Sequence, residues 1–212
     1  MRIERLRREY QGKGLRENDF DPNPIQQFEK WFQDAVDAEI DLPDAMTLAT
    51  VTSDGRPSAR MVLLRGFGEE GFRFYTDYDS PKGVDLCVNP QAALVFYWNQ
   101  LDRQIRISGA VEKTSSEDSD AYFQGRPRDS QISAWASKQS KTIENRQLLE
   151  AAHKEFEEKF RDREVPRPPN WGGYLVRPEW IEFWQGRPNR LHDRLRYDLQ
   201  AEGTWKITRI SP

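Results

Sequence analysis

The sequence predicts a mainly β protein with added helices (α+β), built as an antiparallel β-barrel. Three observations lead to this fold class. Strand-like runs occur early and late in the 212 residues, helical patterns lie between them, and a strong hairpin signal lies near the start. The chain contains no internal repeat and no low-complexity segment. We therefore expect a single domain over residues 1–212.

The first helix is predicted over residues 24–39. The charge-rich residues 1–22 before it predict a mobile N-terminal arm. Asn23 is a typical N-cap residue, Pro24 suits the first helical turn, and Gln26 completes a capping box. Apolar side chains then recur at helical spacing, which indicates an amphipathic helix.

A β-hairpin is predicted next. Residues 45–52 and 59–66 read as strands, and the turn between them contains the pair Asp54-Gly55, which favours a tight hairpin. Further strands are expected over residues 71–78, 91–98, 103–113, 173–184, 190–199 and 204–210. Helices are expected over residues 80–89, 116–124 and 128–137, and in a longer segment from Ile143 to Phe160 that the prolines of 166–169 stop.

Composition excludes several classes of protein. A formal net charge of -3 lacks the basic excess of a nucleic-acid-binding surface. The apolar stretches are shorter than a membrane span, and the basic, polar N-terminus has no signal-peptide core. Cys87 is the single cysteine, so neither an internal disulfide nor a cysteine cluster for zinc is possible. We expect a cytoplasmic protein without a metal site.

Residues 184–194 contain several side chains that can bind ligands. They contain three arginines and one of the two histidines, directly after the aromatic run 180–184. Guanidinium groups gather where planar anions or phosphates are held in a fixed geometry. In an extended strand, Arg190, His192 and Arg194 point to one face, which predicts a wall that binds an anion and a ring.

Two further groups of residues fit phosphates. Ser80, Pro81 and Lys82 follow a strand and open a helix, which is either a phosphate cradle or a well-capped helix. Tyr122, Arg126 and Ser130 offer a phenol, a guanidinium and a hydroxyl, which either bind a second phosphate or form a helix corner. Gln139 and Ser140 either donate to a phosphate or cap the next helix.

Other residues point less clearly to a site. Arg60 and Arg65 are five residues apart, which in one strand sends them to opposite faces. His153 reads as a solvated surface histidine. No Gly-x-Ser-x-Gly motif or Ser/His/Asp ordering indicates a hydrolase. Two phosphate-binding groups together with aromatic residues favour a cofactor reaction between two planar, phosphorylated ligands.

Seven motifs, in this order and spacing, give the chain a specific resemblance over essentially its whole length. It resembles the pyridoxine (pyridoxamine) 5′-phosphate oxidase family. The motifs are Leu-Arg-Arg-Glu-Tyr at 6–10, Arg-Met-Val-Leu-Leu at 60–64, Arg-Pro-Arg-Asp-Ser-Gln at 126–131, Ser-Lys-Gln-Ser at 137–140, Trp-Gly-Gly at 171–173, Ile-Glu-Phe-Trp-Gln-Gly at 181–186 and Arg-Leu-His-Asp-Arg at 190–194.

The resemblance implies an FMN-binding split β-barrel that works as a homodimer with FMN at the subunit interface. It implies that residues 170–212 supply C-terminal strands for dimerisation and substrate binding. The implied reaction oxidises pyridoxine or pyridoxamine 5′-phosphate to pyridoxal 5′-phosphate. A hydride passes from the substrate C4′ to the flavin N5, and O2 accepts the electrons and becomes H2O2.

The resemblance also implies roles for individual residues. The expected FMN-binding residues are Arg60, Met61, Val62, Leu63, Leu64, Arg65, Tyr75, Thr76, Lys82, Gln104, Gln139, Ser140, Trp184 and Arg194. The expected substrate-binding residues are Arg7, Arg8, Glu9, Tyr10, Arg65, Tyr122, Arg126, Ser130, Arg190, Leu191 and His192. Among these, Arg190, His192, Arg7 and Tyr10 are expected to be catalytic, with Arg7 and Tyr10 closing over the substrate from the arm.

The chain departs from the family pattern at three positions. Arg65 stands where the family usually has Lys, Pro81 where many members carry Arg, and Leu42 where an acidic residue is common. The sequence also allows two other functions: a related flavoprotein that oxidises another planar substrate, such as a phenazine precursor, and a non-catalytic carrier of flavin or pyridoxal phosphate. The second phosphate group argues against the former, and Arg190 with His192 argues against the latter.

Overall fold

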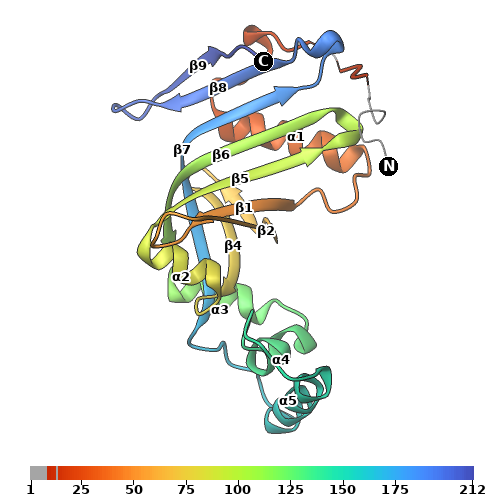
Figure 1. Cartoon of the computed structure of the whole chain (residues 1–212), viewed down its shortest axis with the longest axis vertical. Coiled ribbons are helices and arrows are strands. Elements are labelled where there is room, and N and C mark those ends of the chain that lie inside the picture. The colour runs from red at the N-terminus through yellow and green to blue at the C-terminus, as the bar shows by residue number, and fades with distance from the viewer. Residues whose placement is uncertain (1–8, 13) are drawn as a thin grey trace.

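The computed structural model describes residues 9–12 and 14–212, and within them a nine-stranded antiparallel sheet forms the body of the protein (Figure 1). The sheet curls, and its strand order is β2-β1-β5-β6-β7-β4-β3, with β8 paired to β7 and β9 to β8. The strands are β1 Ala45–Val51, β2 Pro57–Leu63, β3 Gly66–Gly68, β4 Gly71–Asp77, β5 Gln91–Trp98, β6 Arg103–Lys113, β7 Trp171–Gln185, β8 Asp193–Leu199 and β9 Trp205–Arg209.

Helices occupy the positions that the sequence predicts. They are α1 Pro24–Asp37, α2 Pro81–Val88, α3 Ser116–Gln124, α4 Arg128–Ala136 and α5 Arg146–Lys159, with short 3-10 turns at Glu17–Asp19, Asn99–Leu101 and Pro188–Arg190. The expected barrel decorated with helices is therefore confirmed as a curled sheet, with α3, α4 and α5 gathered at one end (Figure 1).

Helix α1 supplies the aromatic centre of the main core. Phe28 is fully buried and meets Phe67, Phe72 and Phe96 edge-on at ring-centroid distances of 4.9–5.2 Å. Such edge-to-face pairs add to the free energy that area burial alone provides. Trp31, one turn later, meets Phe183 of β7 in the same way. The apolar stripe that predicts this helix is thus its buried face.

The start of α1 differs in one detail from the prediction. The side chain of Asn23 accepts the backbone N–H of Ile25 at 2.8 Å, so the N-cap is confirmed. The predicted capping box is wrong, because the backbone N–H of Asn23 donates to Asp21 Oδ1 at 2.9 Å and Gln26 is exposed. A carboxylate two residues upstream takes the place that the box assigns to residue 26.

The predicted hairpin is confirmed, but its second strand ends early. Strand β2 pairs with β1 from Ala45↔Leu63 to Val51↔Pro57. The N–H of Leu64 then donates to Asp44 O, on the β1 side, whereas the N–H of Arg65 donates to Arg73 O, on the β4 side. The chain changes partner between these two residues, and β3 continues along β4.

Strand β7 connects the two ends of the molecule (Figure 1). Its 15 residues pair with β4 near Trp171, with β6 along most of their length, and with β8 near Gln185. The β6–β7 register shifts at Ser108/Gly109. A Cβ on Gly109 would lie 1.8 Å from the carbonyl oxygen of Arg177, so this bulge requires glycine.

The end of α5 also differs from the prediction. The helix ends at Lys159, before the prolines of 166–169 that were expected to stop it. Arg128 of α4 contacts the chain just beyond this end, where its guanidinium donates to Phe160 O at 2.6 Å and to Arg163 O at 3.0 Å. A side chain from a neighbouring helix thus binds the segment that follows α5.

The described part of the arm contacts the C-terminal strands. The N–H of Gln11 donates to Asp102 Oδ2, and the N–H of Leu15 donates to Asp193 Oδ2. Arg209 of β9 binds Glu17 through two nitrogens and the carbonyl oxygen of Leu15 through one. The arm's mobility stays a prediction. No helix in the described ranges is long and apolar enough to cross a membrane.

Candidate functional site

A pocket of about 570 Å³ brings together most of the predicted ligand-binding residues. We call it the barrel pocket. Its lining residues come from β2, β4, the first turn of α2, the α3–α4 corner, the segment after α4 and the start of β7. Four cations and no carboxylate are among the described residues that line it, so it suits anionic ligands. The lining consists of Arg60, Met61, Val62, Leu63, Arg65, Tyr75, Thr76, Lys82, Tyr122, Arg126, Pro127, Ser130, Gln139, Ser140 and Trp171.

One end of the barrel pocket is built around a buried lysine. Lys82 Nζ donates to Gln139 Oε1 at 2.6 Å, to Thr76 Oγ1 at 3.1 Å and to Ser80 Oγ at 3.2 Å. Burial, with a smaller contribution from Arg60, lowers the pKa of Lys82. A buried cation held only by neutral oxygens favours an anion beside it.

The same residues also form the predicted helix cap. Ser80 Oγ accepts the N–H of Gly83, which opens the eight-residue helix α2. The sequence predicted either a capped helix or a phosphate cradle for this segment. The cap is confirmed, and Lys82, in the first turn of α2, lines the pocket. The positive end of α2 thus lies beside the cation.

Arg60 is fixed by residues that the sequence did not single out. Its guanidinium donates to Thr50 Oγ1 at 2.8 Å and to Ser58 Oγ at 2.7 Å, and lies 3.8 Å from Asp85 Oδ2. Asp85 in turn accepts the hydroxyl of Thr50 at 2.6 Å. Burial lowers the pKa of Arg60, and Asp85 opposes the shift. In the sequence, only its position could have indicated Thr50, because this residue lies on β1, opposite the strand that carries Arg60.

Three stacked rings form an aromatic wall at the other end of the pocket. Tyr75 stacks on Tyr122 at 3.7 Å between ring centroids, and Trp171 stacks on Tyr75 at 5.7 Å. The guanidinium carbon of Arg126 lies 4.6 Å from the centroid of the Trp171 ring. Such a contact orients an arginine side chain by a cation–π interaction.

Arg126 has a buried donor that an anion would satisfy. Its Nη1 is buried and has no hydrogen-bond partner among the described residues. Burial lowers the pKa of this guanidinium. Buried donors are otherwise nearly always satisfied, so a ligand oxygen fits here. Ser130, the third member of the predicted phosphate group, lines the pocket beside it.

Arg65 corrects a prediction from spacing. Residues 60 and 65 were expected on opposite faces, yet both line the barrel pocket. The expectation was wrong because β2 ends at Leu63 and the chain switches from β1 to β4 before residue 65. Strand alternation does not continue across such a break.

A second group of predicted residues lies apart from the barrel pocket. We call Tyr10, Trp184, Arg187, Arg190 and His192 the C-terminal cluster. The ring of Tyr10 meets those of Trp184 and His192 edge-on at centroid distances of 5.5 and 5.2 Å. The Trp184 and His192 rings are 4.7 Å apart, and the N–H of Arg187 donates to Nδ1 of His192 at 3.1 Å. Burial first, and Arg190 second, lower the pKa of His192.

The extended wall predicted from Arg190, His192 and Arg194 is wrong. Residues Pro188–Arg190 form a 3-10 turn, in which Asn189 and Arg190 have φ of +55° and +61°. Strand β8 begins only at Asp193. Left-handed backbone at two successive non-glycine residues interrupts the alternation on which the prediction depended.

The three remaining predicted flavin residues form a row across neighbouring strands. Gln104 of β6 pairs with Trp184 of β7, which pairs with Arg194 of β8. Residues opposite one another in adjacent strands share a face. Arg194 donates to both carboxylate oxygens of buried Glu182, at 2.9 and 3.0 Å, and these bonds raise its pKa. Glu182, which anchors Arg194, is not among the residues predicted for the site.

The other predicted residues have different surroundings. Leu64 lies in the main core and does not line the barrel pocket. Glu9 and Leu191 are exposed. Arg7 and Arg8 lie outside the described residues.

The barrel pocket and the C-terminal cluster do not meet within one chain. Trp171, in the pocket, and Trp184, in the cluster, lie at opposite ends of β7. A straight strand of that length would span up to about 50 Å. Gln104, Trp184, Arg190, His192 and Arg194 therefore stand apart from the residues that line the pocket.

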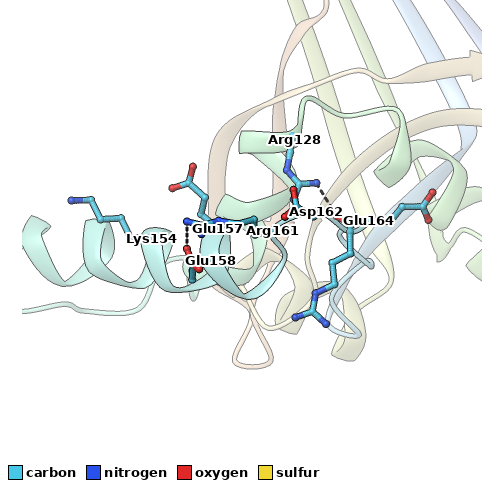
Figure 2. A pocket seen from close by; sticks show the side chains of 8 residues that line it. Arg128, Lys154, Glu157, Glu158, Arg161, Asp162 and Glu164 are labelled. Atoms are coloured by element: carbon cyan, nitrogen blue, oxygen red, sulfur yellow. Dashed lines mark hydrogen bonds and ion pairs between the residues drawn. The ribbon is translucent and has the colours of Figure 1, made fainter.

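A larger hollow, of about 900 Å³, lies beside the C-terminal end of α5 (Figure 2). Its lining mixes both signs of charge, and Arg161 pairs there with Glu158. Arg128 faces it, but its guanidinium is already bound to backbone carbonyls. Without an aromatic wall or an unsatisfied buried group, this hollow is a solvated groove between charged side chains. The described residues also contain no group of three or more metal-ligating side chains.

Two protein-family models match the chain. Residues 32–160 match the family model described as pyridoxamine 5′-phosphate oxidase, and residues 171–212 match the pyridoxine 5′-phosphate oxidase C-terminal dimerisation region. The chain belongs to the pyridoxamine 5′-phosphate oxidase family. It is thus related to oxidoreductases, and its last strands, β7 to β9, match a dimerisation region.

Individual relatives are similar over nearly the full chain. The pyridoxine/pyridoxamine 5′-phosphate oxidase of Cupriavidus metallidurans is 54% identical over 207 residues, covering 98% of this chain and 97% of the relative. That of Rubrobacter xylanophilus is 56% identical, covering 98% and 95%. Membership in this oxidase family therefore does not depend on one segment of the sequence.

Solved structures support the split-barrel fold. PhzG from Burkholderia lata, in complex with tetrahydrophenazine-1-carboxylic acid, is 32% identical with a TM-score of 0.88, covering 95% of this chain and 99% of that one. A pyridoxamine 5′-phosphate oxidase-related, FMN-binding protein from Nostoc punctiforme is 21% identical with a TM-score of 0.72, covering 91% and 100%. At that identity the second likeness concerns the fold alone.

Proposed function

We propose that this protein is an FMN-dependent oxidase that converts pyridoxine 5′-phosphate and pyridoxamine 5′-phosphate to pyridoxal 5′-phosphate, with O2 as electron acceptor. The observation that carries the proposal is the presence of two cationic ends in one pocket: Lys82 in its cradle of oxygens and Arg126 with its unsatisfied Nη1. The names of the relatives, at 54–56% identity, agree with it.

FMN is the cofactor in this proposal, and the barrel pocket fits it. Lys82 and Arg60 would bind the FMN phosphate together with the hydroxyl and amide groups of Thr76, Gln139 and Ser140. The backbone and side chains of 61–63 in β2 would contact the ring system. A helix N-terminus, a buried cation and neutral donors are the groups that bind a phosphate ester.

The substrate phosphate would lie at the other end of the pocket. Arg126 would supply its free Nη1, and Arg65, Tyr122 and Ser130 would add further donors. Two anionic groups, one at each end, would thus fix the flavin and the pyridine ring in stacked positions. Holding two reactants in such geometry lowers a barrier by roughly 7–11 kcal/mol.

We further propose that each active site forms between two subunits. The residues of the C-terminal cluster, with Gln104 and Arg194, lie at the far end of β7 from the pocket of the same chain. A second copy, joined through the matched dimerisation region, would bring its own cluster to the pocket. FMN would then contact both subunits.

The overall reaction balances with the substrate, O2 and, for the amine, water. Bound FMN would supply acceptance of a hydride from the substrate C4′ at N5 and transfer of two electrons to O2. The alcohol also loses its hydroxyl proton, so alcohol and O2 give aldehyde and H2O2. The amine and O2 give the imine and H2O2, and water then hydrolyses the imine to the aldehyde and ammonia.

The residues of the chain would orient the substrate and stabilise charge. Arg190, brought over the pyridine ring, would stabilise negative charge that develops in the transition state. His192 would contact a ring substituent, and Arg7 and Tyr10 would cover the substrate from the arm. The single cysteine, exposed Cys87, supports our expectation that this happens in the reducing cytoplasm.

The first test is whether purified protein carries flavin and turns over pyridoxine 5′-phosphate. We expect a yellow protein that consumes O2 and forms pyridoxal 5′-phosphate. Absence of both flavin and product would contradict the proposal.

The second test addresses the shared site. One variant would carry Arg126→Ala in the barrel pocket and another His192→Ala in the C-terminal cluster, and the two would be unfolded together and refolded as a mixture. Each mixed dimer would contain one site with both parts intact, so a 1:1 mixture should recover roughly a quarter of the wild-type activity. Recovery of none would mean that each site forms within one chain.

A second candidate activity follows from the structural likeness to PhzG, at 32% identity. A phenazine-type substrate carries a carboxylate and no phosphate ester. Arg126→Ala separates the two activities: it should impair turnover of the phosphorylated pyridine strongly and that of an unphosphorylated ring little.

A further inference from the structure

The hydrogen bond between the backbone of Arg187 and the ring of His192 defines where that imidazole carries its proton. The N–H of Arg187 donates to Nδ1 at 3.1 Å. A backbone amide cannot give up its hydrogen, so Nδ1 must offer its lone pair. A neutral imidazole has one protonated and one unprotonated nitrogen, and the proton therefore lies on Nε2.

The surrounding turn is built to keep this bond. Asn189 and Arg190 both adopt left-handed backbone, and Leu191 N donates to Pro188 O, so the chain doubles back and returns residue 192 to the amide of residue 187. Strained backbone of this kind persists only when its surroundings require it. The strain implies that the position of the ring matters.

Aromatic neighbours hold the ring from two other elements. Tyr10 of the arm meets it edge-on, and Trp184 of β7 lies 4.7 Å away. The charged groups nearby are Arg187 and Arg190, both cations on the same turn, and the carboxylate of Asp193, whose Oδ2 lies 3.5 Å from Nη1 of Arg187. Neither a carboxylate nor any other acceptor for Nε2 is bonded to it among the described residues.

Protonation of His192 would disturb the arrangement. A second proton on Nδ1 would face the N–H of Arg187 and break the hydrogen bond. The direction in which the pKa of His192 shifts, downward through burial and through Arg190, agrees with a ring that stays neutral. A neutral ring in this tautomer has a donor at Nε2 and no free lone pair.

We propose that Arg187 is a positioning residue that fixes His192 as the Nε2–H tautomer, so that His192 donates a hydrogen bond to an anionic oxygen of the substrate and does not accept the proton released in the oxidation. The chemical meaning of this inference rests on the proposed function, whereas the tautomer itself does not. It leaves the proton to the substrate's own anion, to solvent or to another group.

The tautomer can be observed without any activity measurement. The chain has two histidines, and His153 lies on α5, away from the cluster. His153→Gln leaves His192 as the single imidazole, so the nitrogen NMR spectrum of the ring-labelled holoenzyme reports that ring alone. At neutral and mildly alkaline pH we expect Nε2 protonated and Nδ1 unprotonated. An Nδ1–H ring, or an even mixture of tautomers, would overturn the proposal.

Two substitutions then test the donor role. The amide nitrogen of Gln can take the place of Nε2, whereas that of Asn lies nearer the position of Nδ1. We expect His192→Gln to retain kcat/KM within about tenfold of wild type and His192→Asn to lose about a further tenfold, the size of one hydrogen bond to a charged group. Retention of FMN, measured by absorbance, should be equal in both.

A general base gives a different result. Both variants would then lose kcat equally, by roughly 10²–10⁴-fold, and the acidic limb of the pH profile of kcat would disappear. That outcome overturns the donor role. If the protein shows no oxidase activity while the ring remains the Nε2–H tautomer, the proposed function fails and the positioning by Arg187 stands.

Discussion

Arg65 and Asp44 form an ion pair at the edge of the barrel pocket, with Nη1 of the arginine 2.9 Å from Oδ2 of the aspartate. The backbone oxygen of Asp44 also accepts the N–H of Leu64, at the point where the chain leaves β1 for β4. Asp44 thus holds both the strand break and the side chain that follows it. Within the described ranges, only Nη1 of the three guanidinium nitrogens of Arg65 has a partner, which leaves the others for a ligand.

The first prediction concerns Arg65 itself. Arg65→Ala should raise KM for pyridoxine 5′-phosphate about tenfold with kcat nearly unchanged, because a hydrogen bond to a charged group contributes about 1.5–3 kcal/mol and partial exposure reduces it. Steady-state kinetics measure this. Arg56→Ala, which removes an arginine paired with Asp54 in the β1–β2 turn, is the matched control. An equal effect of both would exclude a role for Arg65 in the pocket.

The second prediction concerns its partner. Asp44→Asn should lower KM for the phosphorylated substrate about two- to fivefold, since the amide keeps an acceptor for Arg65 but removes a negative charge near the phosphate, and such half-exposed pairs are worth about 1 kcal/mol or less. Asp54→Asn is the control. A rise in KM would mean that the charge of Asp44, and not only its acceptor, positions the arginine.

The third prediction separates the two ligands. Arg190→Ala should impair turnover far more than FMN retention, because we assign Arg190 to the substrate. The residue has φ of +61°, so the substitution also strains the backbone. Arg190→Gly removes the same side chain without that strain. Comparable loss of turnover in both variants would assign the effect to the guanidinium, whereas normal turnover in the glycine variant would refute the assignment.

The fourth prediction tests the position of the Tyr10 ring. A Cβ on Gly186 would lie 2.6 Å from Cδ1 of Tyr10, so Gly186→Ala should displace that ring from the C-terminal cluster and raise KM several-fold while FMN binding stays intact. Adding Tyr10→Ala should remove most of the effect of the glycine substitution, because the clashing ring is gone and only the contact with Cβ of Asp102, at 3.0 Å, remains. Gly68→Ala, which meets nothing within 4 Å, is the steric control.

The fifth prediction follows from the acid–base chemistry of the arm. The hydrogen bond from Arg209 lowers the pKa of Glu17 from 4.5 to about 2. A carboxyl whose pKa is lower in the folded state stabilises that state above its unfolded pKa, and the contribution is lost as pH falls from 4.5 towards 2. The hydrogen-exchange protection factors of residues 14–19, which correct for the pH dependence of the intrinsic exchange rate, should fall over this range in wild type.

Glu17→Gln should show the lower protection factors already at neutral pH, and these should change little on acidification. Glu112→Gln breaks a similar exposed pair, with Arg177, between β6 and β7. It should leave exchange in the arm unchanged. Loosening of the arm by both variants would mean a general loss of stability.

Local chemistry made most of the elements predictable. Ser80 and Pro81 mark the start of α2, and Asp54-Gly55 marks the first hairpin, because caps and turns depend on residues within a few positions of each other. The predicted bounds of β5, β6 and α3 agree with the structure for the same reason.

The failures have non-local causes. Arg60 and Arg65 share a pocket because the strand changes its partner between them, and no pattern within 60–65 records that change. The turn at Asn189 and Arg190 looks like alternation in the sequence, since left-handed backbone in non-glycine residues has no strong signature. The resemblance named candidate ligand-binding residues, but it carried no information on the anchors Asp44, Asp85 and Glu182.

Strand β7 sets the distance between the barrel pocket and the C-terminal cluster. Each residue inserted between Trp171 and Trp184 would displace one surface by about 3.3 Å and turn the following side chains to the opposite face. The bulge at Ser108/Gly109, which requires glycine, already accommodates one shift in the β6–β7 register, so the strand pair has little tolerance for a second shift. Engineering of this enzyme can therefore change the length of the segments around residues 160–170 and 200–203, and must preserve the residue count of β7.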